Sequence, residues 1–264
     1  MGVLIKIAGA KFIDPYIIGK VDIPDVPDEP VEPVTIADYP VQDGLKGLYD
    51  LGGTAEATLV NHAPEPHINT ADEKLESLAV VSEDYCTFTG VANKCRLLTY
   101  LRMPLQNAIT AVVLFRVQDG LRPLLSNRTG GSTANAVGVT IMNDRVLYGK
   151  DGNAEPSAIS FAQINSSTNF AILAMSVSAE RVDAYRYTNG ALNNLGHFEG
   201  AVNPWLTGST GNAIQVGGTG KSDEYKDADI SLVAIHEGVM TDEQLTEICA
   251  FVKNYGEQKG LAIE

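Results

Sequence analysis

Hydrophobic and polar residues follow one another in short runs along most of the chain, with a spacing that indicates β-strands. Apolar stretches of strand length are separated by Gly, Asn, Asp and Ser from about residue 41 to residue 238. Short strands with turn residues between them are typical of an antiparallel sandwich. We therefore predict an all-β fold, an antiparallel β-sandwich of the jelly-roll kind. The clearest strands are expected at 109–117, 136–142, 145–149, 169–178, 181–188, 212–218 and 230–238.

Two hairpin turns stand out in this pattern. Asn189-Gly190 follows the run AYRYT, and Asn-Gly is the strongest short hairpin signal because both positions of its turn require positive φ. Asn143-Asp144 directly separates two further strand runs. We expect a tight hairpin at each place.

The end of the chain departs from the strand pattern and predicts one α-helix. Thr241 and Gln244 form a T-x-x-Q capping box, with Met240 and Leu245 as the flanking hydrophobic staple. Gly256 stands where a left-handed C-cap is expected. We expect the helix to lie across an open edge or end of the sandwich, with an apolar stripe on one face that consists of Leu245, Ile248, Cys249, Val252 and Tyr255.

The first 40 residues are organised differently. Residues 3–8 read as a short strand, but so small a segment cannot bury a core of its own. The next stretch carries prolines at a strict three-residue interval among acidic residues, which matches the turn of a polyproline II helix; they are Pro24, Pro27, Pro30 and Pro33. We expect an attachment or oligomerisation arm at 1–20, a semi-rigid spacer at 21–40 and the jelly-roll domain at 41–264. Such an arm suits anchoring to a larger assembly or strand exchange between sister subunits, for example in a trimer.

The charge of the chain narrows its partners. It carries 33 acidic against 19 basic residues, a net charge of −14, and the basic residues are scattered. Nucleic acid is not an expected partner, because its binding relies on Lys and Arg that neutralise phosphates. The apolar run at the N-terminus is too short for a signal peptide, and no stretch approaches the roughly 20 apolar residues that span a bilayer. We expect no membrane partner and a chain made in the cytoplasm.

Three stretches carry a family resemblance. GLKGLYDLGG at 44–53, VDAYRYTNGAL at 182–192, and the segment at 225–261 that runs through DISLVAIHEG into MTDEQLTEI occur in this order. Together they resemble the concanavalin A-like, laminin-G-type jelly roll, over roughly residues 44–263. The resemblance implies a strand that ends in an NG turn and a last strand that leads into a short helix. His236 and Glu237 stand where that family usually has an aromatic and a polar residue.

The order of arm, proline spacer and lectin-like sandwich resembles virion proteins of tailed bacteriophages. There such domains occur on capsid decorations, tail fibres and receptor-binding appendages. The resemblance implies a non-enzymatic structural virion protein, made in the bacterial host cytoplasm. It would be held by its arm among other virion proteins and would display its domain for assembly or host-glycan adhesion. Two alternatives are a purely architectural capsid or tail protein that binds no sugar, and a polysaccharide-degrading enzyme on the same fold.

Signals for catalysis are weak. A glycosidase needs two carboxylates that face one cleft, and the E-x-D-x-x-E strand of related laminarinase-type enzymes is missing, as are G-x-S-x-G and Walker sequences. We predict that the chain is not an enzyme.

Its three cysteines are too few for a disulfide scaffold. Cys86 and Cys95 are close enough in sequence to bridge a hairpin, but we favour free thiols, and we expect Cys249 to be buried.

Candidate binding residues come from the residue types that recognise sugars, an aromatic platform with Asn, Asp or Arg beside it. They lie in a polar loop, at a strand end and on one side of a strand, and they are Trp205, Asn127, Arg128, Asp183, Tyr185 and Tyr187. For Trp205 the alternative is a residue that anchors its loop, and for Asn127 and Arg128 it is a plain turn. For the three strand residues the alternative is a subunit interface.

A metal site is the other candidate. The stretch SDEYKDADIS at 222–231 gathers carboxylates, of which Asp227 and Asp229 are candidate ligands for Ca²⁺. The alternative is a solvated acidic loop, and no other cofactor is expected.

Overall fold

A computed structural model describes residues 33–64, 73–76, 78–90, 95–102, 108–127, 138–149, 157–202, 213–218 and 226–264. The chain divides into two units, Met1–Pro33 and Val34–Glu264. The predicted arm and most of the proline spacer lie outside the described residues.

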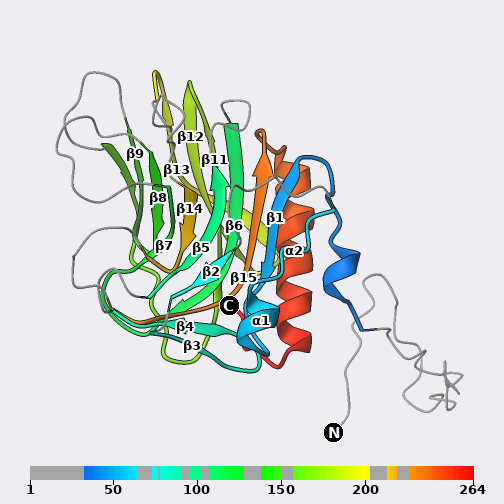
Figure 1. The fold of residues 1–264 in the computed structure, drawn as a ribbon. Coiled ribbons are helices and arrows are strands. Elements are labelled where there is room, and N and C mark those ends of the chain that lie inside the picture. The colour runs from blue at the N-terminus through cyan, green and yellow to red at the C-terminus, as the bar shows by residue number, and fades with distance from the viewer. Residues whose placement is uncertain are drawn as a thin grey trace, which may run out of the picture. The chain divides into compact units, whose positions relative to one another are not determined.

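Two antiparallel sheets form a sandwich in the second unit, as predicted (Figure 1). The larger sheet has the order β13-β12-β11-β6-β15-β4-β3, with β1 also paired to β15. Its strands are β1 (Leu45–Asp50), β3 (Ala79–Val81), β4 (Cys86–Phe88), β6 (Ala108–Val117), β11 (Ala171–Ser178), β12 (Arg181–Thr188), β13 (Ala191–Glu199) and β15 (Ala228–Glu237). The smaller sheet has the order β10-β9-β8-β7-β14-β5-β2. Its strands are β2 (Lys74–Leu75), β5 (Leu97–Arg102), β7 (Pro123–Ser126), β8 (Val139–Met142), β9 (Arg145–Tyr148), β10 (Ser157–Ser160) and β14 (Ala213–Val216).

Each strand run predicted between residues 109 and 238 contains a strand of the structure, and the one predicted at 3–8 lies outside the described residues. The long polar strand β13 was not predicted, because most of its side chains are exposed and it shows no apolar alternation. It lies at an edge of the larger sheet. The predicted turn places it there, since Asn189 and Gly190 have φ of 54° and 76° and lead β12 directly back into β13.

The space between the sheets is filled by one large apolar cluster. Along β6, alternate residues point toward the smaller sheet, which follows from the two-residue period of a strand; these are Ile109, Ala111, Val113, Phe115 and Val117. Truncating a fully buried side chain such as Phe115 to alanine costs about 3–5 kcal/mol in comparable cores. Burial of this cluster therefore stabilises the sandwich.

The helix α2 (Asp242–Gln258) covers the outer face of the larger sheet (Figure 1). The prediction that it lies at an edge or end is therefore wrong. Both faces of β6 and β15 are apolar, so the outer face also needs a cover. Val112, Leu114 and Leu232 of the sheet share a second apolar cluster with Leu245, Ile248, Cys249 and Val252 of the helix.

The start of the helix is as predicted. The Thr241 hydroxyl accepts a hydrogen bond from the Gln244 backbone N–H at 3.2 Å, and Gln244 Oε1 accepts one from the Thr241 N–H at 3.0 Å. Met240 and Leu245, the predicted staple pair, are both buried in the outer cluster.

The end of the helix differs from the prediction. The helix passes through Gly256 and continues to Gln258, and Gly260, whose φ is 84°, follows two residues later. The Gly260 N–H donates to the Glu257 carbonyl and the Leu261 N–H to the Gly256 carbonyl, both at 3.0 Å, which is the Schellman arrangement. Gly256 instead permits close packing, since a Cβ there would lie 2.8 Å from Leu114 Cδ2.

The segment before β1 belongs to the same outer layer. Tyr39 is buried, and its ring meets that of Phe251 edge-on at 5.3 Å between centroids. The Val34 N–H donates to Gln258 Oε1 at 2.7 Å. Residues 34–40, which the proline pattern assigns to the spacer, are thus part of the sandwich unit, and they include a short 3₁₀ helix (Ile36–Asp38).

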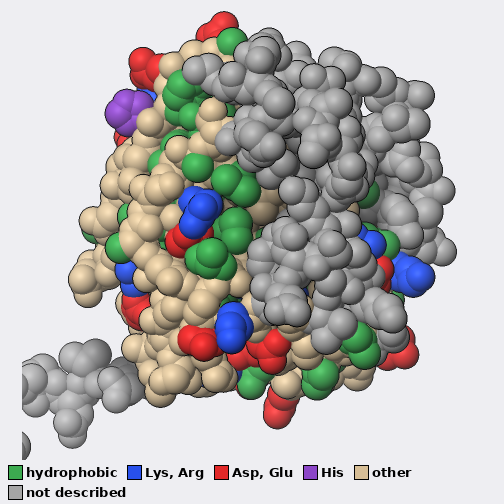
Figure 2. Space-filling view, turned by 90° about the vertical axis from the view of Figure 1, so that its left-hand side faces the viewer, with side chains coloured by type: hydrophobic (Ala, Val, Ile, Leu, Met, Phe, Trp, Pro, Cys, Tyr) green, Lys and Arg blue, Asp and Glu red, His purple; other side chains and the backbone are tan. Residues whose placement is uncertain are grey.

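Among the described residues, the surface has no large apolar patch on the side shown in Figure 2, and the cysteines are unpaired. On the side shown in Figure 2, the coloured hydrophobic side chains form small groups among polar and charged ones. Within the described residues, no helix has the length and apolar composition that a membrane crossing needs. Cys86, Cys95 and Cys249 are free and buried. Burial raises the pKa of both Cys86 and Cys249 to about 12, so these thiols are unreactive at neutral pH.

Candidate functional site

Beyond the helix, the outer face of the larger sheet becomes charged. Thr87 of β4, Asp229 of β15 and Arg116 of β6 lie directly opposite one another in register. Arg116 donates to Asp229 Oδ2 from Nε at 2.9 Å and from Nη2 at 2.6 Å. The Thr87 hydroxyl donates to Asp229 Oδ1 at 2.6 Å. Only 10% of the Asp229 side chain is exposed, so both of its oxygens are fixed by neighbouring strands in a partly dry setting.

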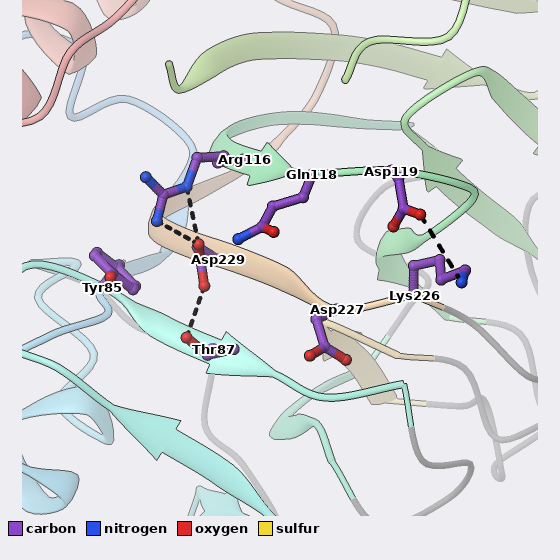
Figure 3. Close-up of a pocket in the computed structure, with 8 residues that line it drawn as sticks. All are labelled: Tyr85, Thr87, Arg116, Gln118, Asp119, Lys226, Asp227 and Asp229. Carbon is purple, nitrogen blue, oxygen red and sulfur yellow. Dashed lines mark hydrogen bonds and ion pairs between the residues drawn. The ribbon is translucent and has the colours of Figure 1, made fainter. Parts of the chain in front are cut away.

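A pocket of about 520 Å³ opens over this row. It is lined by Tyr85, Thr87, Arg116, Gln118, Asp119, Lys226, Asp227 and Asp229. Figure 3 shows Tyr85 at one end and the Asp119–Lys226 pair at the other, with Gln118 and Asp227 between them. The Lys226 Nζ lies 3.9 Å from Asp119 Oδ2, and both side chains are exposed at the rim.

The Tyr85 ring is held by its neighbours. Its centroid lies 5.6 Å from that of Phe170. The guanidinium carbon of Arg116 lies 5.3 Å from the Tyr85 centroid and 4.9 Å from that of Phe170, which is within cation–π range. The pocket therefore has an aromatic wall whose orientation is set by a cation that is itself paired with Asp229.

A buried arginine binds chain segments that border the pocket. Arg122 is 2% exposed, and its Nη1 donates to the carbonyls of Thr89 at 3.0 Å and Lys226 at 2.9 Å. Its Nη2 donates to the Gly217 carbonyl. These bonds join the segment after β4 to the segment before β15. Asp227 strengthens the same junction, since its Oδ1 accepts from the Gly90 N–H at 2.7 Å.

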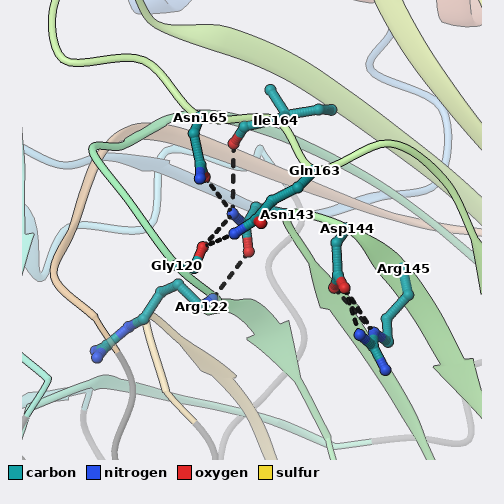
Figure 4. A network of polar contacts seen from close by, with 8 residues as sticks. All are labelled: Gly120, Arg122, Asn143, Asp144, Arg145, Gln163, Ile164 and Asn165. Carbon is teal, nitrogen blue, oxygen red and sulfur yellow. Dashed lines mark hydrogen bonds and ion pairs between the residues drawn. The ribbon is translucent and has the colours of Figure 1, made fainter.

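Asn143 binds the backbone of Gly120 and Arg122 (Figure 4), which follow Gln118 and Asp119 in the chain. Its side chain is fully buried; Nδ2 donates to the Gly120 carbonyl at 2.9 Å, and Oδ1 accepts from the Arg122 N–H at 2.9 Å. The predicted hairpin between β8 and β9 is present. Neither Asn143 nor Asp144, the two residues of its turn, has positive φ. Among the non-glycine residues of the described ranges, Asn189 alone has it.

The predicted strand residues of β12 lie elsewhere. Asp183, Tyr185 and Tyr187 are 4%, 9% and 5% exposed, and the two tyrosines pack in the outer cluster with α2. Burial raises the pKa of Tyr185 to about 12. Asp183 accepts from Arg181 at 2.7 and 2.8 Å. The strand thus directs the two tyrosines under the helix layer, and none of the three residues lines the pocket.

The remaining predicted contacts are Asn127, Arg128 and Trp205. Asn127 is 8% exposed, and its Oδ1 accepts from the Val139 N–H at 2.6 Å, so it joins β7 to β8. Arg128 and Trp205 lie outside the described residues.

Asp227 and Asp229, the predicted calcium ligands, both line the pocket. Calcium takes about six to eight oxygen ligands. Asp229 is already engaged by Arg116 and Thr87, and one oxygen of Asp227 by Gly90. Across the described ranges, no three His, Cys, Asp or Glu side chains are placed to hold a metal ion. Asp229 thus braces the pocket wall, Asp227 keeps one oxygen without a bond to the described residues, and the calcium site stays a prediction.

Sequence reasoning missed Tyr85, Arg116 and Gln118. A signal existed for one of them, because Arg116 interrupts the apolar run ITAVVLFRV and Asp229 interrupts DADISLVAI. Charged residues inside apolar strands usually have a partner. Tyr85 and Gln118 have no comparable signal.

Comparisons with known proteins place the fold. No protein-family model and no curated protein sequence matches the chain. Trypanosoma rangeli sialidase matches with a TM-score of 0.52 and 13% identity, over 86% of this chain and 34% of the sialidase chain. The botulinum neurotoxin type G receptor binding domain matches at 0.54 and 10%, over 80% and 51%. The serotype D ligand binding domain, solved in complex with N-acetylneuraminic acid, matches at 0.52 and 9%, over 84% and 56%.

These similarities agree with the β-sandwich architecture of the chain. At such low identity they show the fold alone. This chain spans between about a third and just over half of the length of these structures. The neighbours include both an enzyme and receptor-binding domains, so the fold is compatible with either role.

Proposed function

We propose that the chain is a non-enzymatic carbohydrate-binding module and that the pocket beside Tyr85 is its sugar site. The supporting observation is the pocket itself, where a braced aromatic ring stands beside fixed polar groups. A sugar presents an apolar face to an aromatic ring and hydroxyls to planar polar side chains. The volume of about 520 Å³ falls in the range of about 300–1,000 Å³ that is common for small-ligand sites.

Binding is favoured over hydrolysis by the state of the carboxylates. A retaining or inverting glycosidase usually needs one carboxylic acid that donates a proton and a second carboxylate on the other side of the bond. Both oxygens of Asp229 are already engaged, one by Arg116 and the other by Thr87. Asp227 would then lack the second carboxyl group that hydrolysis of the glycosidic bond requires. The enzymatic alternative keeps some support from the sialidase fold, and it predicts glycan cleavage.

For the biological setting, we propose a structural virion protein of a tailed bacteriophage that displays this module. The proposal rests on the sequence of the arm and spacer together with a lectin-like domain. In it, residues 1–20 hold the chain to other virion proteins or to sister subunits. The architectural alternative keeps this anchoring without any sugar binding.

A glycan array with the full chain tests the proposed site. Tyr85→Ala and Gln118→Ala are expected to reduce binding, by roughly tenfold and a few-fold, because one removes the platform and the other a polar contact. Asn194→Ala, at an exposed amide on β13, is the matched control and should bind normally. If wild type binds no glycan, the adhesion proposal fails and the architectural role is favoured. If wild type releases sugar from bound glycans, the enzymatic role replaces it.

A further inference from the structure

We infer that the pocket selects neutral or amino-bearing sugars and discriminates against sialylated ones, an inference that rests on the proposed function. Two basic and three acidic side chains line the pocket. Arg116 is paired with Asp229, and Lys226 with Asp119. Asp227 takes part in none of the ion pairs among the described residues; its Oδ1 accepts only the Gly90 N–H. Among the described lining residues, Asp227 is therefore the one carboxylate without an ion pair.

This carboxylate is suited to sugar hydroxyls and ammonium groups. The bond from Gly90 to Asp227 Oδ1 orients the group and leaves Oδ2 as an acceptor. A carboxylate accepts well from a hydroxyl, and its hydrogen bond with an ammonium group is charge-assisted. On the donor side, Arg116 uses Nε and Nη2 on Asp229, while Gln118 is exposed and offers an amide. The lining thus matches a polyol more closely than an anion.

A sialic acid would place its own carboxylate near Asp227. Like charges at a distance of about 4 Å in water cost enough to weaken binding by about fivefold. The net charge of −14 on the whole chain adds to this repulsion at longer range. The serotype D toxin domain was solved with N-acetylneuraminic acid, so this chain would differ from that neighbour in ligand class while sharing its fold.

The test measures the full chain against matched pairs of glycans that differ only by a terminal sialic acid, such as lactose and 3′-sialyllactose, with a glucosamine oligosaccharide as the amino-bearing probe. We expect the sialylated member to bind at least about fivefold more weakly in dilute buffer, and this ratio to shrink in 0.5 M salt because salt screens the repulsion. Asp227→Asn should weaken neutral binding, since an amide oxygen accepts less strongly, and should bring the sialylated form closer to it.

The control is Glu247→Gln, which removes one negative charge at an exposed position on α2 outside the pocket. It should leave the ratio unchanged. Equal or tighter binding of the sialylated member by wild type overturns the inference while the proposed function survives. A ratio that moves equally in the control and in Asp227→Asn overturns it as well, since the selectivity would then come from net charge. If neither member of any pair nor the glucosamine oligosaccharide binds, the proposed function itself fails.

Discussion

The hydroxyl of Tyr39 lies 2.8 Å from Nε2 of His236, a buried bond across 197 positions of the chain. The other ring nitrogen, Nδ1, lies 3.2 Å from the backbone carbonyl of Asp43. A carbonyl only accepts, so Nδ1 carries the proton and Nε2 accepts from Tyr39. This arrangement requires a neutral imidazole. Burial accordingly lowers the pKa of His236 to about 4, and the segment before β1 is attached to the last strand through a group sensitive to acid.

The sandwich is expected to lose stability below pH 6.5 because of His236. In the unfolded chain a histidine has a pKa of about 6.5, so as the pH falls the unfolded state takes up a proton before the folded state does. The stabilisation is complete above about pH 6.5 and is lost as the pH falls toward about 4. The linkage amounts to roughly 2–3 kcal/mol between pH 7.5 and pH 4.5. Urea unfolding at the two pH values measures it.

His236→Phe provides the reference for this prediction. The variant is destabilised at pH 7.5, since Tyr39 and Asp43 lose their partner, but the deficit should shrink at pH 4.5. If the variant loses the same stability at both pH values, the pKa of His236 does not differ between the folded and the unfolded chain.

Tyr39→Phe is expected to destabilise the protein by about 1–3 kcal/mol. It removes the hydroxyl and leaves the buried Nε2 of His236 without its donor. Tyr85→Phe is the matched control, because its hydroxyl makes no hydrogen bond with the described residues, and it should change stability little. Equal unfolding midpoints in urea for Tyr39→Phe and wild type would contradict the proposed polarity of the bond.

Gly260→Ala is expected to cost about 1–2 kcal/mol, because residue 260 has a φ of 84° and only glycine adopts this conformation freely. Gly260→Asn should cost less, since asparagine tolerates the left-handed region better. No atom lies within 4 Å of a Cβ added there, so crowding does not enter. Thermal unfolding of the two variants measures the cost of the left-handed backbone conformation. Equal losses of stability in both variants would point to another cause.

Asp229→Ala is expected to destabilise the sandwich by about 2–4 kcal/mol, because it leaves a mostly buried Arg116 without its counter-ion. Arg116→Met should behave similarly. The double variant should be less destabilised than the sum of the two, with a coupling of about 1–3 kcal/mol. Thr87→Val, which removes one hydrogen bond to Asp229, is the smaller control. Additive losses in a double-mutant cycle would mean that the pair is not coupled.

Much of the fold follows from the sequence, and the candidate site follows only in part. The strand runs, the Asn189-Gly190 turn and the start of α2 were all predicted, since each depends on residues near one another in the chain. Asp227 and Asp229 were named as site residues, although for a metal. Tyr85, Arg116 and Gln118 were not named, because their meeting depends on which strands pair.

The end and position of α2 show the same division. Gly256 looks like a cap in the sequence, but its function is to let the helix approach Leu114, more than a hundred positions earlier. The helix was expected at an edge, whereas the apolar outer faces of β6 and β15 draw it onto the sheet.

The set of elements follows from local sequence: strands of period two, turns that need positive φ, and a capped helix whose signals lie within about four residues. The pocket, in contrast, depends on how distant strands pair. Arg116 and Asp229 are 113 positions apart, and they meet because β6 and β15 pair in one register. That register is set by burial of apolar faces throughout the sandwich, since a shift by one residue would turn every core side chain toward the opposite face.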